Sequence, residues 1–342
     1  MKRIYTLLIA FGITTIALAQ GNHNSSAMRF SGKASFAVAS TVIEVESDTV
    51  LYAGTSGTQA DITIPQMTYN MGGQEMTIPS FTIHNATFAM DMATMTATFA
   101  NQTYNETLTV DGVEKAIIGQ SLEASYKHDA FNTFTLSTTF KYGNMPMPIT
   151  YQITAHYIKG YTNKLDVTVG GTYKYNNESV TYDIRTYPDG ETTKLDVKVP
   201  AYVLQNTMIG DLTIGSYIVK GLTFDEAKGG YYRDYIEDGL TMHFIAEKNG
   251  QVTMNDNYPM NTGTQDILVV FEGRQAIITN NFKPGNMPFP ICSTFPGSTE
   301  ASISSINRVQ PNEDSLFNLV GQRVNRNAKG LLIKGGKKYF SK

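Results

Sequence analysis

Two residue types are almost missing from this chain of 342 residues, which has no tryptophan and a single cysteine, Cys292. One cysteine excludes an intrachain disulfide, so the cores must be held together by burial alone. Cys292 has no neighbouring His or Asn, and we interpret it as a small buried residue rather than a nucleophile. Long helical periodicity is also missing, while Tyr, Phe, Gly and Thr are abundant. The chain is therefore expected to be all-β.

Sequence motifs of catalysis and metal binding are missing as well. The five histidines lie at no metal-ligand spacing to one another or to the cysteine, and there is no Gly-x-Ser-x-Gly elbow or phosphate loop. Asp61 and Asp196 recur in matching contexts, but each precedes an alternating strand and is interpreted as a turn-side hydrogen-bond acceptor. We therefore predict no catalytic residue, no metal and no cofactor, and we expect the protein not to be an enzyme.

Apolar runs long enough to cross a membrane are missing, and the longest run lies at the N-terminus. Residues 1–19 begin with Lys2 and Arg3, continue through an apolar run, and end in Ala17-Leu18-Ala19. This pattern predicts a secretory signal peptide, with Gln20 as the first mature residue. The mature protein is expected in the periplasm, at the cell surface or outside the cell.

Charge is unevenly distributed along the chain. The C-terminal segment 312–342 carries seven basic and two acidic residues, whereas the body before it is acidic. An acidic body argues against nucleic-acid binding and against attachment to anionic membranes.

A ten-residue stretch occurs twice. Residues 140–149 read FKYGNMPMPI and residues 282–291 read FKPGNMPFPI, with eight of ten positions identical. Upstream, TIPSFTIHNATF at 77–88 aligns with TIGSYIVKGLTF at 213–224. In the hairpin, Gly143-Asn144 is a turn pair because both residues tolerate positive φ. The spacing predicts one domain used twice, at residues 28–160 and 161–297.

Alternating patterns separated by turn residues predict seven to ten short strands in each half, the number found in a sandwich or a closed barrel. The periodicity alone leaves both architectures open. The expected strands include residues 33–46, 60–65, 76–83, 87–99, 116–126, 165–175, 180–187, 194–199, 211–219, 240–247, 266–272 and 275–282.

The run from Tyr52 to Pro65, the segment 209–214 and the two Gly-Asn-Met-Pro-x-Pro-Ile endings resemble the calycin-like β-barrel domain, an exported bacterial family. This resemblance implies two tandem, duplicated, antiparallel up-and-down barrels of eight strands, similar to lipocalins. Because the chain has no tryptophan, the Gly-x-Trp signature of true lipocalins is excluded.

The C-terminal segment carries a second resemblance. After a linker at 298–311, the motifs Leu319-x-Gly321-Gln-Arg323-Val324 and Lys329-Gly330-Leu-Leu-Ile333 resemble C-terminal sorting signals of the type IX secretion system. The resemblance implies that residues 312–342 engage secretion machinery. An extra strand pair that only stabilises the protein is the alternative.

Methionine is enriched in the middle of the first half. In the predicted strand 87–99, Phe88, Met90 and Met92 share one face, and Asp91, costly to bury unpaired, lies on the other. Methionine is adaptable enough to line a pocket. We therefore predict Phe88, Met90 and Met92 as candidate ligand-binding residues. Gap-filling in a dry core is the alternative interpretation.

Two function classes follow. The first is an exported, non-enzymatic binding protein whose barrels hold a small apolar ligand. The second is a structural or surface-interaction protein with filled barrels, which presents loops to glycan or protein partners. An eight-stranded barrel is compatible with both, because its interior holds either packed side chains or one small guest. Ligand identity and oligomeric state are left open by the sequence.

Overall fold

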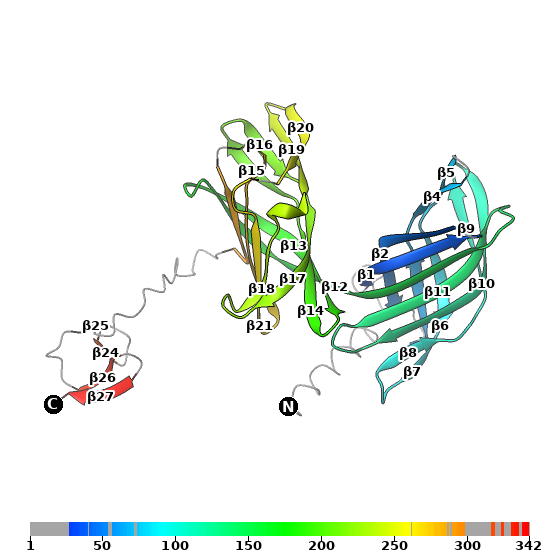
Figure 1. Ribbon diagram of the computed structural model, residues 1–342, viewed down its shortest axis with the longest axis horizontal. Helices are drawn as coiled ribbons and strands as arrows, with labels where there is room; N and C mark the ends of the chain where they lie inside the picture. Colours follow the sequence, from blue (N-terminus) through cyan, green and yellow to red (C-terminus); the bar gives the residue numbers. More distant parts are fainter. Residues whose placement is uncertain are drawn as a thin grey trace. The chain divides into compact units, whose positions relative to one another are not determined.

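The computed structural model describes residues 27–297, apart from positions 40, 54–56, 72–73, 261, 286 and 288, and also four short strands between residues 316 and 341. These residues form an all-β protein (Figure 1), as predicted, with a single short 3₁₀ helix, η1 (Ile236–Asp238). Within the described part, no helix is long and apolar enough to cross a membrane. The predicted signal peptide, residues 1–19, and the predicted linker, residues 298–311, lie outside the described residues.

The N-terminal strands follow an up-and-down course with antiparallel pairing. β1 pairs with β2, β2 with β3, β3 with β6, and β10 with both β8 and β9. β10 continues to β11, β11 to β12, and β12 returns to β1, while β7 pairs with β8. The strands are β1 (Met28–Val38), β2 (Thr41–Ala53), β3 (Gln59–Ile64), β4 (Met67–Met71), β5 (Gln74–Ile78), β6 (Phe81–Thr87), β7 (Ala89–Asp91), β8 (Thr96–Phe99), β9 (Tyr104–Val110), β10 (Val113–Lys127), β11 (Thr133–Tyr142) and β12 (Ile149–Val169).

Eight strands of the C-terminal half close into an antiparallel barrel. Its order is β12, β13, β14, β17, β18, β21, β22 and β23, and β23 pairs with β12 again. Four further strands form a second sheet in the order β15-β16-β19-β20. Along the chain, β15 and β16 lie between β14 and β17, and β19 and β20 lie between β18 and β21. The strands are β13 (Tyr173–Asp189), β14 (Thr192–Val199), β15 (Tyr202–Thr207), β16 (Gly210–Ile214), β17 (Tyr217–Asp225), β18 (Gly230–Asp234), β19 (Thr241–Lys248), β20 (Gln251–Pro259), β21 (Asp266–Glu272), β22 (Gln275–Phe282) and β23 (Ile291–Phe295).

One strand belongs to both halves. The first part of β12 pairs with β1 and β11, and the second part pairs with β13 and β23 (Figure 1). At the changeover, Ile158 is in register with Arg29 of β1 on one side and Arg185 of β13 on the other. The domain boundary expected after residue 160 therefore falls inside a continuous strand.

Each half has its own hydrophobic core. The N-terminal cluster of buried residues runs from Phe30 to Ala155, and the C-terminal cluster runs from Leu165 to Phe295. Strand β11 illustrates the cause, since Phe134, Leu136, Thr138 and Phe140 are buried while the residues that alternate with them are partly exposed. This period-two burial follows from the pleat of a strand, which sends alternate side chains to opposite faces.

The two copies of the repeated hairpin are built alike. The Gly143 N–H donates to the Ala116 carbonyl at 2.7 Å, and the Gly285 N–H donates to the Pro259 carbonyl at 2.7 Å. Both glycines have positive φ, 54° and 47°, where other residues are strained. The predicted turn role of Gly143 is therefore confirmed, and the same geometry recurs in the second copy.

The single strand predicted over residues 87–99 is wrong. The chain instead forms the β7–β8 hairpin, with a turn between Asp91 and Thr96. The Asp91 carboxylate accepts from the Ala93 N–H at 2.9 Å and from the Thr94 hydroxyl at 2.7 Å. An aspartate that bonds to the backbone two residues later is a turn signal, and it overrides the alternating pattern here.

The C-terminal tail is a separate compact unit that begins at Ser298. Its described part is a four-stranded antiparallel sheet in the order β25-β24-β26-β27. The strands are β24 (Leu316–Asn318), β25 (Arg323–Val324), β26 (Gly330–Lys334) and β27 (Lys337–Ser341).

Candidate functional site

The C-terminal half contains a pocket of about 340 Å³. It lies where the β12–β13 turn, the β15–β16 hairpin and the loop after β22 come together with strands β19 and β20. None of the described residues that line it carries a charge. The lining residues are Val169, Tyr173, Tyr175, Leu204, Asn206, Thr207, Met208, Ile209, Leu212, Phe244, Met254, Tyr258, Met287 and Phe289.

The inner wall of the pocket is made of buried apolar side chains. Leu204 of β15 and Leu212 of β16 are directly opposite one another across the hairpin, and both are buried. Phe244 of β19 packs edge-to-face against Tyr258 of β20, with ring centroids 5.5 Å apart. A pocket with aliphatic and aromatic walls and no charge suits a small apolar guest.

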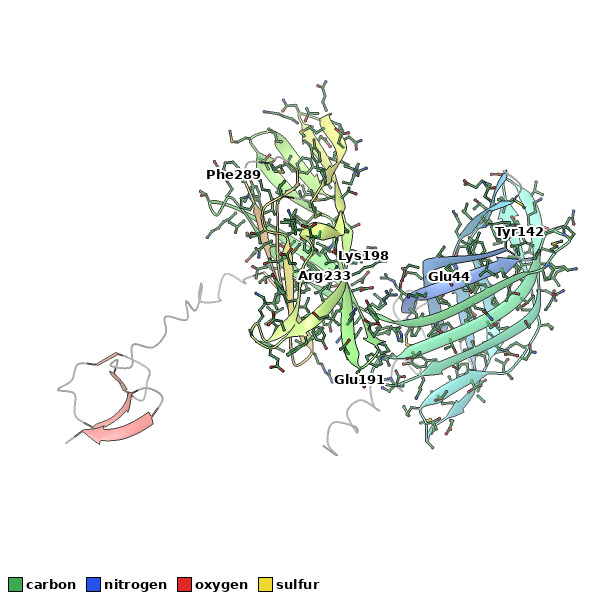
Figure 2. The ribbon with its side chains drawn as sticks, viewed as in Figure 1. Glu44, Tyr142, Glu191, Lys198, Arg233 and Phe289 are labelled. Carbon is green, nitrogen blue, oxygen red and sulfur yellow. The ribbon has the colours of Figure 1, made fainter. Side chains whose placement is uncertain are left out.

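The rim of the pocket exposes large apolar side chains from three separate segments. Met208 at the tip of the β15–β16 hairpin is 83% exposed, and Phe289, marked in Figure 2, is 46% exposed. Tyr173 and Ile209 are also exposed large side chains of this rim. Exposed apolar side chains gathered around one opening are a feature of binding sites rather than of ordinary surface.

The rim is an ordered structure. The Gly170 N–H donates to the Pro290 carbonyl at 2.9 Å, which ties the loop of Phe289 to the β12–β13 turn. A Cβ atom at Gly170 would lie only 2.9 Å from Phe289 Cδ1, so the ring rests directly on the glycine. On the hairpin, Lys248 Nζ donates to the Met208 carbonyl at 3.3 Å.

Below the inner wall lies a cluster of buried tyrosines. The Tyr235 hydroxyl donates to Asn280 Oδ1 at 2.8 Å, and Asn280 Nδ2 donates to the Tyr217 hydroxyl at 2.7 Å. The hydroxyl of Tyr202 is buried and has no partner among the described residues. Burial raises the pKa of Tyr217 to about 12, so its phenol is neutral at physiological pH.

The residues predicted to bind ligand are not brought together at this pocket. Phe88 is buried in the N-terminal core, and Met90 of β7 is partly buried against that core. Met92 lies in the β7–β8 turn and is 57% exposed, so it does not point inward as expected. The turn closed by Asp91 is the reason, because it ends the alternation before residue 92.

Cys292 differs from its interpretation as a buried residue. It lies on the outer face of β23 and is exposed. Partial desolvation, together with the nearby charge of Asp266, raises the pKa of its thiol. A raised pKa disfavours the thiolate, which is the reactive form.

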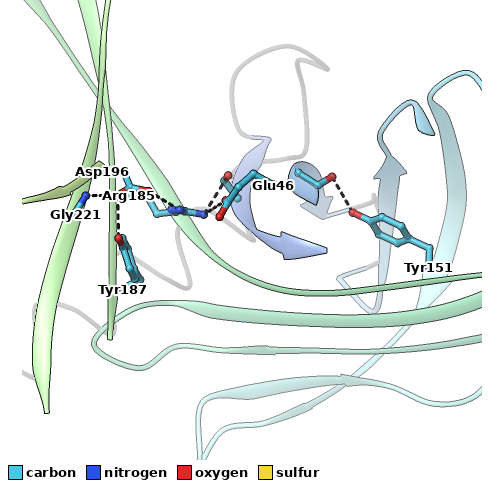
Figure 3. A network of polar contacts seen from close by, with 8 residues as sticks. Glu46, Tyr151, Arg185, Tyr187, Asp196 and Gly221 are labelled. Carbon is cyan, nitrogen blue, oxygen red and sulfur yellow. Dashed lines mark hydrogen bonds and ion pairs between the residues drawn. The ribbon is translucent and has the colours of Figure 1, made fainter. Parts of the chain in front are cut away.

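A polar network joins the two halves on either side of β12 (Figure 3). Arg185 of β13 is paired with Asp196 of β14 and also donates to Glu46 Oε2 of β2 at 3.0 Å. Arg29 of β1 is paired with Asp183 of β13 at 3.0 Å. These side chains line a shallow polar groove of about 280 Å³ in which acidic and basic groups already neutralise one another.

The two recurring aspartates accept backbone hydrogen bonds, as predicted. Asp61 Oδ1 accepts from the Asn85 N–H at 2.8 Å, and Asp196 Oδ1 accepts from the Gly221 N–H at 2.8 Å. The acceptors stand at β-bulges, where the β3–β6 and β14–β17 registers shift, rather than at turns.

Comparison with known proteins supports the barrel assignment for the C-terminal half. The family model of the Calycin-like beta-barrel domain matches residues 159–298. A crystal structure described as a "putative outer membrane protein" from Bacteroides fragilis is similar at 14% identity and a TM-score of 0.25, covering 82% of this chain and 97% of that chain. No curated protein matches this chain. The fold of residues 159–298 is thus that of a calycin-like barrel.

Proposed function

We propose that this is an exported, non-enzymatic binding protein whose C-terminal barrel holds one small apolar molecule. The carrying observation is the uncharged pocket of about 340 Å³, with its buried aliphatic wall and its exposed apolar rim. Pockets of this size and lining take small ligands largely by burial of apolar surface. The ligand class is therefore an uncharged, mostly apolar molecule such as a lipid fragment or a pigment.

The N-terminal half is, in this proposal, a second copy of the same barrel. Support comes from the antiparallel run of pairings that leads from β9 through β10, β11, β12, β1, β2 and β3 to β6, from the matching hairpin bonds of Gly143 and Gly285, and from the paired acceptors Asp61 and Asp196. A duplication explains all three together.

Export is proposed from the sequence. The basic, apolar and small-residue regions of residues 1–19 are those of a signal peptide. The basic tail, whose described part is a small antiparallel sheet, is proposed to engage secretion machinery. N-terminal sequencing of the native protein tests the first point, since Gln20 is the expected first residue and Met1 would contradict it.

The binding function is tested with a fluorescent apolar probe titrated into the full-length mature protein. We expect one site, and Met208→Ser should weaken binding several-fold because it removes an apolar rim contact. Met92→Ser is the matched control, since Met92 is also an exposed methionine in a hairpin turn but belongs to the N-terminal half. Absence of any probe binding would refute the proposal. Equal loss in both variants would place the binding outside this pocket.

One observation favours the alternative, a surface-interaction protein. A row of four aromatic side chains lies on the C-terminal barrel, with neighbouring ring centroids 5.5 to 6.2 Å apart in edge-to-face and tilted contacts. In order along the row they are Phe224, Tyr231, Phe271 and Tyr161. Phe224 is among the exposed large side chains. Aromatic rows of this kind contact sugars or apolar protein surfaces. Loss of glycan or protein capture in Phe224→Ser, with unchanged probe binding, would support this second function.

A further inference from the structure

The repeated hairpins place two methionines at equivalent positions, Met145 in the N-terminal half and Met287 in the C-terminal half. Met287 lines the apolar pocket. Both methionines pack against the core of their own half, but Met145 also accepts a hydrogen bond from the Tyr69 hydroxyl, with 3.7 Å between oxygen and sulfur. The same part of the fold is therefore open at Met287 and occupied at Met145.

The residue that corresponds to Tyr69 is found from the strand register. Tyr69 of β4 is directly opposite Met76 of β5, and Leu204 of β15 is directly opposite Leu212 of β16. Two pairs further along, Met67 is opposite Ile78 and Tyr202 is opposite Ile214. The segments 77–88 and 213–224 align in sequence, so Leu204 stands where the first half has Tyr69.

The side chains at the two equivalent positions, Tyr69 and Leu204, differ in length. The Tyr69 ring is buried, reaches across to the hairpin, and packs edge-to-face against Phe36 with centroids 6.0 Å apart. Leu204 is also buried, but its shorter side chain forms the pocket wall and leaves the space before Met287 empty.

We propose that the size of the side chain at position 204 determines the volume of the pocket. We further propose that Tyr69 acts as a plug, meaning that its ring fills the equivalent space in the N-terminal half. The protein then has one site rather than two, and the halves differ in role although they share a fold. The inference rests on the proposed binding function for its ligand, but the plug itself is a statement about packing. The Tyr69 hydroxyl and the Met145 thioether supply the specific contact that holds the ring in place.

The test uses the full-length mature protein and two reciprocal substitutions. Leu204→Tyr places the larger side chain into existing empty space, so the fold should be retained, and probe affinity should fall at least tenfold. Tyr69→Leu should create a second site, and the stoichiometry of a small apolar probe should rise from one towards two. Tyr69→Phe is the control, because it keeps the ring in place and should leave one site.

Crystals of each variant under xenon give a readout independent of the probe, because xenon enters apolar cavities. Xenon density is expected in the C-terminal pocket of the unmodified protein, beside Met145 in Tyr69→Leu, and not in the C-terminal pocket of Leu204→Tyr. If the unmodified protein binds no probe but the xenon pattern holds, the binding function fails and the plug stands. Xenon or probe in the pocket of Leu204→Tyr at unchanged occupancy would overturn the plug, even if Tyr69→Leu fails to fold.

Discussion

Asp61 and Asp196 occupy the same place in the two halves of the protein, and each accepts a backbone N–H at 2.8 Å from a residue with positive φ. The donors are Asn85, with φ of 54°, and Gly221, with φ of 71°. At each site the register of the strand pair shifts, which leaves a backbone N–H without a carbonyl partner on the neighbouring strand. The carboxylate accepts the hydrogen bond from this N–H. The partners differ, because Asp196 is also paired with Arg185 in a buried position, while Asp61 contacts the exposed His84.

This difference predicts unequal costs of removing the two carboxylates. Asp196→Ala should destabilise the protein by about 3 kcal/mol, because it leaves Arg185 largely buried without its main partner. Asp61→Ala should cost less, about 1 to 2 kcal/mol, because it removes a backbone hydrogen bond and an exposed contact with His84. Urea denaturation of each variant measures both values. Asp256→Ala, an exposed change on β20, serves as the control and should stay within about 0.5 kcal/mol of the unmodified protein. Equal costs at the two aspartates would contradict this account.

The buried tyrosine cluster predicts a loss of stability at alkaline pH. The pKa of Tyr217 is raised from 10.0 to about 12 by burial, so the folded protein holds this proton more tightly than the unfolded chain. Its stabilising contribution is therefore complete below about pH 10 and is lost as the pH rises towards about 12. The loss amounts to roughly 2.7 kcal/mol for two pKa units.

Urea denaturation at a series of pH values across this window measures the effect. Tyr217→Phe should reduce the slope of stability against pH, even though it lowers stability at every pH by leaving Asn280 Nδ2 without its acceptor. Tyr173→Phe, at an exposed rim tyrosine, should leave the slope as it is. An unchanged slope in Tyr217→Phe would show that other groups control alkaline unfolding.

Division of the chain after residue 160 tests how far the halves depend on one another. Residues 149–158 of β12 pair with β1, and residues 158–169 pair with β13, so this cut leaves each half most of its own ladder. We expect fragments 20–160 and 161–300 each to give a β-type circular dichroism spectrum and a cooperative melt. Both should melt below the intact protein, because the Arg29–Asp183 and Arg185–Glu46 pairs are lost, each worth about 1 kcal/mol or less. A fragment that stays unfolded would mean that one half templates the other.

The features predicted correctly from sequence are those fixed by local chemistry. Alternating residues such as Phe134, Leu136 and Phe140 reveal a strand because the pleat has a period of two, and Gly143 reveals a turn because few residues accept its φ. The two errors on the methionine strand share a local cause as well. Asp91 is the turn signal, because its carboxylate bonds to the backbone N–H of Ala93, whereas the alternating pattern alone places it on the polar face of a strand.

The pocket was not predictable from composition, because the methionine enrichment lies in the N-terminal half and the pocket lies in the C-terminal half. Tyr69 and Leu204 are both buried positions in matching strands, and the longer Tyr69 side chain reaches its hairpin methionine whereas Leu204 forms a pocket wall. A residue-by-residue comparison of the two repeats contains this signal, since a large residue in one copy faces a small one in the other. The exposure of Cys292 follows from the alternation of β23, in which Ile291 and Ser293 are buried, but no strand is predicted there from the sequence.

The shared strand β12 also restricts which insertions and deletions the sequence can accept during evolution. Odd-numbered residues face inward on both sides of the changeover, as Ile153 and Ala155 do before it and Leu165 and Val167 do after it. A flexible linker tolerates a gained or lost codon, whereas a single inserted residue near Gly160 would turn every following side chain of β12 to the opposite face. The number of residues at the junction therefore decides which side chains of β12 face the core of the C-terminal half. A single inserted residue would be tolerated there only if a β-bulge absorbs it, such as the register shift between Asn163 and Leu165, so variation in the spacing between the two halves should accumulate in their loops instead.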